Sequence, residues 1–359
     1  MKSNANRCGI FVASVLFTCA LSTQIFAQQA AVSPDPAVIA PLAPESLLLD
    51  IVPYNDRLIA VGERGHVLIN HQDREWRQAS PVPVQSTLTR ITTFGRRLWS
   101  VGHDSAIISS MDGGDSWFLQ HFEPSAEEPL LDVLFINPNR GFAIGAYGRF
   151  MSTGDGGSTW QTERIADRVT SESIDWDALG QLRGDIETIP DDVELEADDD
   201  ELLLDKGCYE FQECHLNKLL RLDDGRMMIA AERGYGYRSV DDGESWDAFA
   251  FPYTGSMFGL VEQGECIIAF GLRGHIQKSC DFGDSWRQFQ TEGEQGLMGG
   301  MILPNGNALL VGNGATRIEL TPDNEMERQY DRLGSDYAAV ALDQQGNQVL
   351  VGEDGIIYE

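Results

Sequence analysis

The sequence predicts an all-β protein: a seven-bladed β-propeller of four-stranded antiparallel blades, with an acidic insertion between blades 3 and 4. Three observations support this prediction. One phrase recurs seven times, each copy contains short apolar segments separated by glycine-containing turns, and these segments lack the 3.6-residue period of an amphipathic helix. Four short antiparallel strands in each repeat are typical of a propeller blade.

Residues 1–27 have the layout of a secretory signal peptide. A short basic start is followed by an apolar run from Gly9 to Leu21 and by small residues up to Ala27. This order of basic, apolar and small-residue regions is typical of exported proteins. We therefore expect cleavage after Ala27 and export of the mature chain, to the periplasm if the source is a Gram-negative bacterium.

Two alternatives to a cleaved signal peptide are weaker. A signal anchor would need a longer apolar run, because a membrane span takes about 20 apolar residues. A lipoprotein anchored at Cys19 would need small residues just before that cysteine, and residues 16–18 are Leu-Phe-Thr. No later segment is long and apolar enough to span a bilayer, so we expect no direct membrane insertion after cleavage.

Residues 28–46 form an N-terminal segment for which we expect a role in closing the ring. The printed sequence ends three strands into the seventh copy, and a blade without its outermost strand exposes an unpaired edge. The hypothesis is that residues 28–46 supply that outermost strand. Their prolines restrict them to an edge position, which is the position required.

Residues 47–359 contain the seven copies. Each copy reads as a strand, a second strand that mostly ends in Gly, a short turn, a third strand and, in five copies, a turn that ends in Trp. The interval of 86 residues between the third and fourth copies is one period plus an insertion. The turn positions, spaced by 40, 43, 86, 40, 41 and 40 residues, are Gly62, Gly102, Gly145, Ala231, Gly271, Gly312 and Gly352.

Four copies carry the element Ser/Thr-x-Asp-x-Gly-x-Ser/Thr-Trp. We expect the Asp to accept hydrogen bonds from amides of the turn, the Gly to adopt a positive φ, and the Trp ring to pack between sheets. An Asp repeated in a repeated turn therefore indicates a structural role and not paired catalytic acids. The predicted structural pairs are Asp112 and Trp117, Asp155 and Trp160, Asp241 and Trp246, and Asp281 and Trp286.

This element resembles the Asp-box, or bacterial neuraminidase repeat, and the longer phrase around it is similar to the photosystem II stability and assembly factor propellers. The resemblance covers about residues 47–359 apart from the insertion. It implies a seven-bladed propeller that acts as a binding chaperone or assembly scaffold, without catalysis. Sialidases also carry Asp-boxes, but the Arg-Ile-Pro motif that they use is absent from this sequence.

Arginines near the second-to-third-strand turns are the predicted partner-binding residues. Arg64, Arg233 and Arg273 stand two positions after the turn residue, and Arg149 stands two positions further on in the third copy. These turns lie on one face of a propeller, where guanidinium groups suit carboxylate or phosphate recognition. The resemblance also implies an arginine-rich patch at comparable turns. The alternative is that each Arg pairs with a nearby acid such as Glu63.

The insertion, residues 164–206, contains 15 Asp and Glu. Within 191–201, eight of eleven residues are acidic, without the alternating ligands and central Gly of a calcium loop. A solvated loop is the simpler interpretation. The functional alternative is a partner-binding arm with a short docking helix around Trp176.

Four cysteines remain after signal cleavage, an even number in an oxidising compartment. Cys208 and Cys214 are close in sequence, and Cys266 and Cys280 stand about equally far from one turn, so they face each other across a hairpin. We expect a disulfide in each pair. Metal binding is the weaker alternative, because neither a CxxC motif nor a neighbouring His accompanies these cysteines.

The formal charge of −30 excludes proteins whose main partner is nucleic acid, since phosphate binding needs a basic surface. We expect a monomeric, exported, non-catalytic propeller, without a cofactor or metal, that binds a protein of a membrane or envelope complex and supports its assembly. A glycan-binding or sialidase-like protein is one alternative. A periplasmic accessory of an envelope transporter is another.

Overall fold

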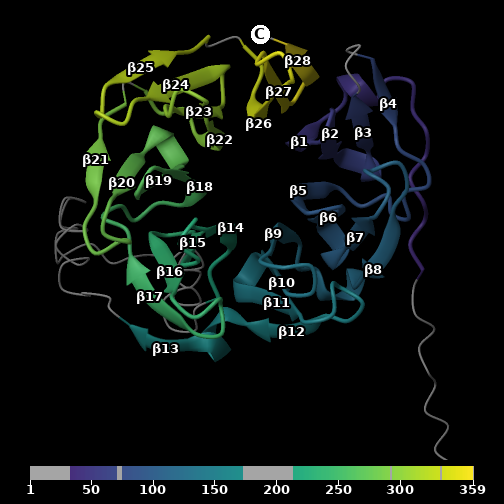
Figure 1. Ribbon diagram of the computed structural model, residues 1–359, viewed down its shortest axis with the longest axis horizontal. Coiled ribbons are helices and arrows are strands. Elements are labelled where there is room, and N and C mark those ends of the chain that lie inside the picture. Colours follow the sequence, from purple (N-terminus) through teal and green to yellow (C-terminus); the bar gives the residue numbers. More distant parts are fainter. Residues whose placement is uncertain (1–32, 71–74, 173–212, 292, 332–333, 359) are drawn as a thin grey trace, which may run out of the picture. The chain divides into compact units, whose positions relative to one another are not determined.

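The computed structural model describes residues 33–70, 75–172, 213–291, 293–331 and 334–358, and the predicted signal peptide lies outside this range. Residues 33–358 build seven β-sheets that stand like blades around a central axis, in chain order (Figure 1). The predicted seven-bladed propeller is therefore confirmed. None of the helices among the described residues is long and apolar enough to cross a membrane.

In each of the first three blades, four antiparallel strands follow one another from the axis outward. Blade 1 comprises β1 (Leu48–Tyr54), β2 (Arg57–Gly62), β3 (Val67–Asn70) and β4 (Trp76–Gln78). Blade 2 comprises β5 (Leu88–Phe94), β6 (Arg97–Gly102), β7 (Ile107–Ser110) and β8 (Phe118–His121). Blade 3 comprises β9 (Leu130–Phe135), β10 (Gly141–Gly145), β11 (Arg149–Thr153) and β12 (Gln161–Arg164).

The remaining four blades repeat this arrangement with two departures, in blades 4 and 7. Blade 4 comprises β14 (Leu216–Arg221), β15 (Met227–Ala231), β16 (Tyr235–Ser239), β17 (Trp246–Ala250) and the added β13 (Val169–Glu172). Blade 5 comprises β18 (Met257–Gln263), β19 (Cys266–Gly271), β20 (Ile276–Ser279) and β21 (Arg287–Phe289). Blade 6 comprises β22 (Leu297–Ile302), β23 (Ala308–Gly312), β24 (Thr316–Leu320) and β25 (Met326–Gln329), and blade 7 comprises β26 (Tyr337–Leu342), β27 (Gln348–Gly352) and β28 (Gly355–Tyr358).

Seven apolar cores hold the ring together, one between each pair of neighbouring blades. The core between blades 7 and 1 packs Val349 and Val351 against Leu48 and Ile51. Alternation of side chains along a strand gives each inner strand two apolar faces, one for each neighbouring blade. Because every blade needs a neighbour on both sides, the ring closes.

The predicted insertion begins later than the sequence indicated. Residues 164–172 belong to the propeller, because Arg164 ends β12, a short 3₁₀ helix (Ile165–Arg168) follows, and β13 then pairs in parallel with β17. The start of the acidic segment thus becomes the outermost strand of the next blade (Figure 1). The rest of the insertion up to residue 206, with the proposed docking helix, lies outside the described residues.

The prediction that residues 28–46 complete blade 7 is wrong for the part that the structure describes. Residues 33–46 form no strand, and the sheet of blade 7 has three strands. The segment instead crosses to blade 1, where the Ala37 amide donates to the Val82 carbonyl (2.9 Å), and then forms a 3₁₀ helix at Ala43–Glu45. Four prolines within residues 33–46 remove the amides that a paired strand needs.

The four Asp turns share one hydrogen-bond pattern. Asp112 accepts bonds from the Ser116 amide (3.0 Å) and hydroxyl (2.5 Å), while the Ser110 hydroxyl accepts from the Gly114 amide (2.9 Å). The turns of Asp155, Asp241 and Asp281 repeat these contacts. These side-chain bonds lower the pKa of Asp281 to about 2. The aspartates are therefore occupied within their own turns.

The aromatic residues of these turns differ in burial. Trp117 and Trp246 are fully buried, and the Trp117 indole donates to the Gly114 carbonyl (2.9 Å). Trp160 and Trp286 are half-buried. Neighbouring blades are also linked at these turns, because Arg57 of blade 1 donates to the Gly113 carbonyl of blade 2 (2.9 Å).

One predicted disulfide joins Cys266 and Cys280 across the β19–β20 hairpin, with Cα atoms 4.0 Å apart. Cys214 is also disulfide-bonded, and its predicted partner Cys208 lies outside the described residues. Closing a loop by a disulfide restricts the unfolded chain and so stabilises the folded one.

Candidate partner-binding face

The turns between the second and third strands of the seven blades lie on one face of the ring, here called the turn face. In blade 1 the amide of Glu63 donates to the carbonyl of Leu47, the residue before β1 (3.0 Å). The other six blades repeat this bond at the equivalent positions. A Cβ atom on Gly62 would stand 2.1 Å from the same carbonyl oxygen. The recurring Gly is therefore explained by close backbone approach, and it fixes where the next two residues project.

The residue two positions after the turn position adopts a left-handed conformation in six blades; in blade 6 it is Gly314, and in the other five it carries a side chain and has φ between 53° and 57°. Its side chain stands at the tip of the turn. These five residues are Arg64, Asp104, Tyr147, Arg233 and Arg273. The sequence analysis thus placed three arginines correctly at one repeated position of the turn face.

Arg64 and Arg273 are exposed, and neither makes a hydrogen bond or an ion pair with any residue in the described part of the chain. Each guanidinium therefore offers its five N–H donors to solvent or to a partner. Arg233 is half-buried and interacts within the protein. The alternative that every turn arginine pairs with a local acid does not hold for Arg64 and Arg273.

Arg149 does not lie with the other arginines at the tips of the turns, contrary to the sequence-based expectation. Its side chain is 3% exposed and forms ion pairs with Glu123 (2.5 Å) and Glu128 (2.7 Å). Arg149 is the first residue of β11 and not the tip of the turn, so its side chain enters the blade. Arg164 also pairs with Glu128 (2.5 Å), which makes a four-residue ion network inside blade 3 and its neighbouring loop.

Two acidic side chains at the same face, Asp104 and Asp336, are engaged within the protein. Asp104, at the tip in blade 2, accepts a bond from the Ser86 hydroxyl (2.5 Å). Asp336, before β26, accepts from the Asn313 side chain (2.7 Å) and the Gly314 amide (2.8 Å). Glu63, beside Arg64, and Glu353 in blade 7 also lie at these turns, so the face carries carboxylates as well as the exposed arginines.

Aromatic and aliphatic side chains accompany the arginines. Tyr147 is 50% exposed and contacts His215 edge to face, with ring centres 4.8 Å apart. Leu272, 39% exposed, precedes Arg273, and His275 stacks on Tyr253 at 3.5 Å. Burial, together with Arg273, lowers the pKa of His275, so this imidazole is neutral at pH 7. The sequence analysis considered only arginines at this repeated position and so did not include Tyr147.

Arginine beside exposed aromatic and aliphatic groups is the composition of protein-contact surfaces. In the described ranges, no group of three or more His, Cys, Asp or Glu side chains is placed to hold a metal ion. Fold and site together define the class: a seven-bladed β-propeller with an arginine-bearing turn face.

Comparison with known proteins narrows this class. The chain is similar to photosystem II assembly lipoproteins Ycf48. It is 27% identical to that of Synechococcus sp. (strain CC9902) over 194 residues, which cover 52% of this chain and 56% of the relative. For the protein of Prochlorococcus marinus (strain MIT 9312), identity is 26% over 226 residues, covering 60% and 65%. The chain thus matches little more than half the length of these two relatives, and no family model matches.

Solved structures give the same result for the fold. The structure titled YCF48 bound to D1 peptide has a TM-score of 0.61 at 13% identity, covering 90% of this chain and 98% of that one. YCF48 from Cyanidioschyzon merolae has a TM-score of 0.61 at 14% identity, with the same coverage. Streptogramin B lyase has a TM-score of 0.64 at 9% identity, covering 88% and 95%, which shows that enzymes share the fold. The predicted resemblance to photosystem II assembly factor propellers is confirmed.

Proposed function

We propose that this protein is an exported, non-catalytic propeller that binds a protein partner and helps to assemble or stabilise a membrane or envelope complex. The observation that carries the proposal is the pair of exposed arginines, Arg64 and Arg273, whose donors are unused on the turn face. The names of the curated relatives support a role in assembly, and a solved relative that holds a D1 peptide supports a protein partner.

Charge complementarity indicates the chemistry of the partner. An exposed guanidinium binds carboxylates in a two-pronged geometry, and a surface of fixed charge selects its partner mainly through the rate of association. We therefore expect an acidic segment of the partner to contact Arg64 and Arg273, with Tyr147 and Leu272 supplying apolar contact. Arg233 completes this surface in blade 4.

The test is affinity capture from solubilised membranes of the source organism with the wild-type protein and with Arg64→Glu/Arg273→Glu. We expect the double variant to lose the captured membrane protein, because two attractive contacts become repulsive. A third change, Arg233→Glu, asks whether blade 4 contributes. All variants should keep the wild-type circular dichroism spectrum, since exposed substitutions seldom alter stability by more than about 0.5 kcal/mol.

Arg96→Glu is the matched control. Arg96 is exposed in the β5–β6 hairpin, at the opposite end of the blade from the turn face, so its reversal changes the net charge as much as either single reversal, Arg64→Glu or Arg273→Glu, without touching the proposed surface. Equal capture by the double variant and by Arg96→Glu would contradict the proposal. Binding to a glycan array or turnover of a sialidase substrate would support the glycan alternative instead.

A further inference from the structure

The wall of the central channel is divided into a charged half and an uncharged half. The same position of the innermost strand faces the axis in every blade, one residue past the bulge at its start. Blades 1 to 4 place charged residues there, alternating in sign, and blades 5 to 7 place the smallest residues. In blade order they are Asp50, Arg90, Asp132, Lys218, Gly259, Gly299 and Ala339.

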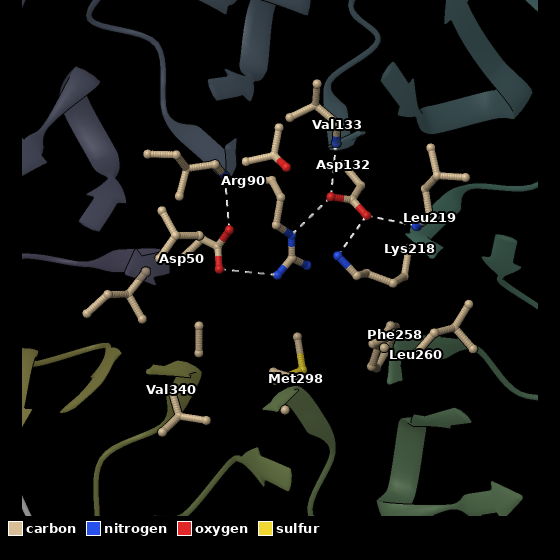
Figure 2. Close-up of a pocket in the computed structure, with 18 of the residues that line it drawn as sticks. Asp50, Arg90, Asp132, Val133, Lys218, Leu219, Phe258, Leu260, Met298 and Val340 are labelled. Atoms are coloured by element: carbon tan, nitrogen blue, oxygen red, sulfur yellow. Dashed lines mark hydrogen bonds and ion pairs between the residues drawn. The ribbon is translucent and has the colours of Figure 1, made fainter. Parts of the chain in front are cut away.

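The four charged side chains form one cluster, called here the channel quartet (Figure 2). Arg90 lies between the two acids, with Nη1 3.7 Å from Asp50 Oδ1 and Nε 3.7 Å from Asp132 Oδ1. Lys218 Nζ stands 3.0 Å from Asp132 Oδ2. The contacts of Arg90 are ion pairs at long range and not close hydrogen bonds.

Donors exceed acceptors in this cluster. Asp132 accepts from the backbone amides of Val133 (2.9 Å) and Leu219 (2.8 Å), and Asp50 accepts from the Ile91 amide (2.9 Å). The carboxylates are thus partly used by the backbone. The buried Nε of Arg90 has no hydrogen-bond partner among the described residues. A buried N–H donor without an acceptor is costly, and an anionic oxygen is one group that can accept from it.

A cavity of about 250 Å³ lies beside the quartet and is closed on the far side by apolar groups. Figure 2 shows Phe258, Leu260, Met298 and Val340 across the cavity from the charged side chains. Gly259 and Gly299 carry no side chain where charged side chains stand in the other half, because the Phe270 ring and the Ala338 carbonyl lie 2.1 Å and 2.4 Å from where their Cβ atoms would stand. The cavity therefore has one donor-rich wall and one apolar wall, a combination of polar and apolar groups that is typical of small-molecule sites.

We propose that the channel binds a small monocarboxylate, with its carboxylate on Arg90 and Lys218 and its apolar part against Met298 and Val340. This site is separate from the arginines of the turn face and does not depend on the proposed partner. A carboxylate bonded to a guanidinium and an ammonium satisfies the unused donors, and the apolar wall excludes water from these bonds. A free organic acid and the C-terminal residue of a polypeptide share this chemistry.

The test is isothermal titration of the purified protein with hexanoate, hexylamine and 1-hexanol, which share one chain and differ in charge. We expect saturable binding of hexanoate only. N-acetyl-leucine and N-acetyl-leucinamide then distinguish the two sources of carboxylate. Tighter binding of N-acetyl-leucine than of hexanoate assigns the site to a polypeptide C-terminus, and the reverse order assigns it to a free acid.

Two variants at Met298 keep the quartet intact. Met298 is 37% exposed and makes no ion pair, so both substitutions should fold. Met298→Glu should weaken hexanoate binding by about tenfold or more through like-charge repulsion, and Met298→Lys should strengthen it. The proposal is overturned if hexanoate does not bind, if hexylamine binds equally well, or if the two variants have the same affinity. The quartet would then serve only to join the inner strands.

Discussion

Replacement of Arg149 by Met tests whether this residue is structural or binds the partner. Its guanidinium is 3% exposed and donates to Glu128 and Glu123, which are 14% and 44% exposed. Removing one partner of a buried ion pair costs about 3–5 kcal/mol, because the other charge stays buried. In the variant, Glu128 keeps its ion pair with Arg164 and Glu123 can be hydrated by solvent. We therefore expect the free energy of unfolding to fall by about 3 kcal/mol, the lower end of this range.

The loss should depend on pH. Burial alone would raise the pKa of Glu128, but hydrogen bonds from Arg164 and Arg149 outweigh burial and lower it. A lowered pKa in the folded protein means that this carboxylate stabilises the fold above its ordinary pKa of 4.5, and that the stabilisation is lost as the pH falls through the folded value. The difference between Arg149→Met and wild type should therefore be largest near neutral pH and should shrink on acidification.

Urea denaturation at about pH 7 and about pH 4 measures both effects. Arg164→Met is the matched control, because Arg164 pairs with the same glutamate but is 42% exposed. We expect Arg164→Met to lower the free energy of unfolding by at most about 1 kcal/mol, because exposed ion pairs contribute no more than this to stability. If Arg149→Met were as stable as wild type yet failed to capture the partner, the buried-network interpretation would be wrong.

Three further predictions concern the blades. Trp117→Ala should lower the free energy of unfolding, measured by urea denaturation, by about 3–5 kcal/mol, because the Trp117 ring is fully buried. The control Phe118→Ala should lower it by about 0.5 kcal/mol or less, because Phe118 is 61% exposed. Equal losses in the two variants would refute the role given to the indole. Asp281→Asn should lower the free energy of unfolding near neutral pH. The difference from wild type should fade between pH 3.8 and about pH 2, where the wild-type carboxylate becomes protonated. A difference that does not depend on pH would show that the charge of Asp281 does not matter in this turn. Cys266→Ser/Cys280→Ser should lower the free energy of unfolding by about 3 kcal/mol, which is the stabilisation expected from a disulfide that closes a loop of about 15 residues. Unchanged stability would exclude a structural role for this disulfide.

The blades could be predicted from the sequence because one physical requirement recurs in each of them. Gly62 and its equivalents must allow close backbone contact, and Asp112 and its equivalents bond within a turn, so the same residue types return at fixed intervals. The two departures could not be predicted in this way. Among the described strands β13 has no equivalent in another blade, and its short Val-Thr-Ser-Glu segment lies at the edge of an acidic run, where no repeat reveals it.

The candidate sites were predicted less completely. The position two residues after the turn residue identified Arg64 and Arg273, which lie at the tips of their turns. The distance of Arg149 from its turn residue could not show that Arg149 begins a strand and points inward. The channel quartet was missed, although alignment of the repeats would have placed its four residues at nearly the same position of each repeat. Asp50 and Arg90 stand 12 residues before their turn positions, and Asp132 and Lys218 stand 13 before theirs. Each charged residue occurs in a different repeat, so only the closed ring shows that they meet.

The joint between blades 7 and 1 has the same character as the other six, although no peptide link near the axis crosses it. Leu48 and Ile51 pack there against Val349 and Val351, together with Ala43 of the N-terminal segment. The Trp76 indole donates to the Tyr358 hydroxyl (2.8 Å) and the Gln344 side chain donates to the Asn55 carbonyl (3.4 Å) across the same joint. Within the described residues, no strand is exchanged across this seam. The toroid should therefore tolerate circular permutation, because a break moved to another inter-blade connection would leave an equivalent seam behind.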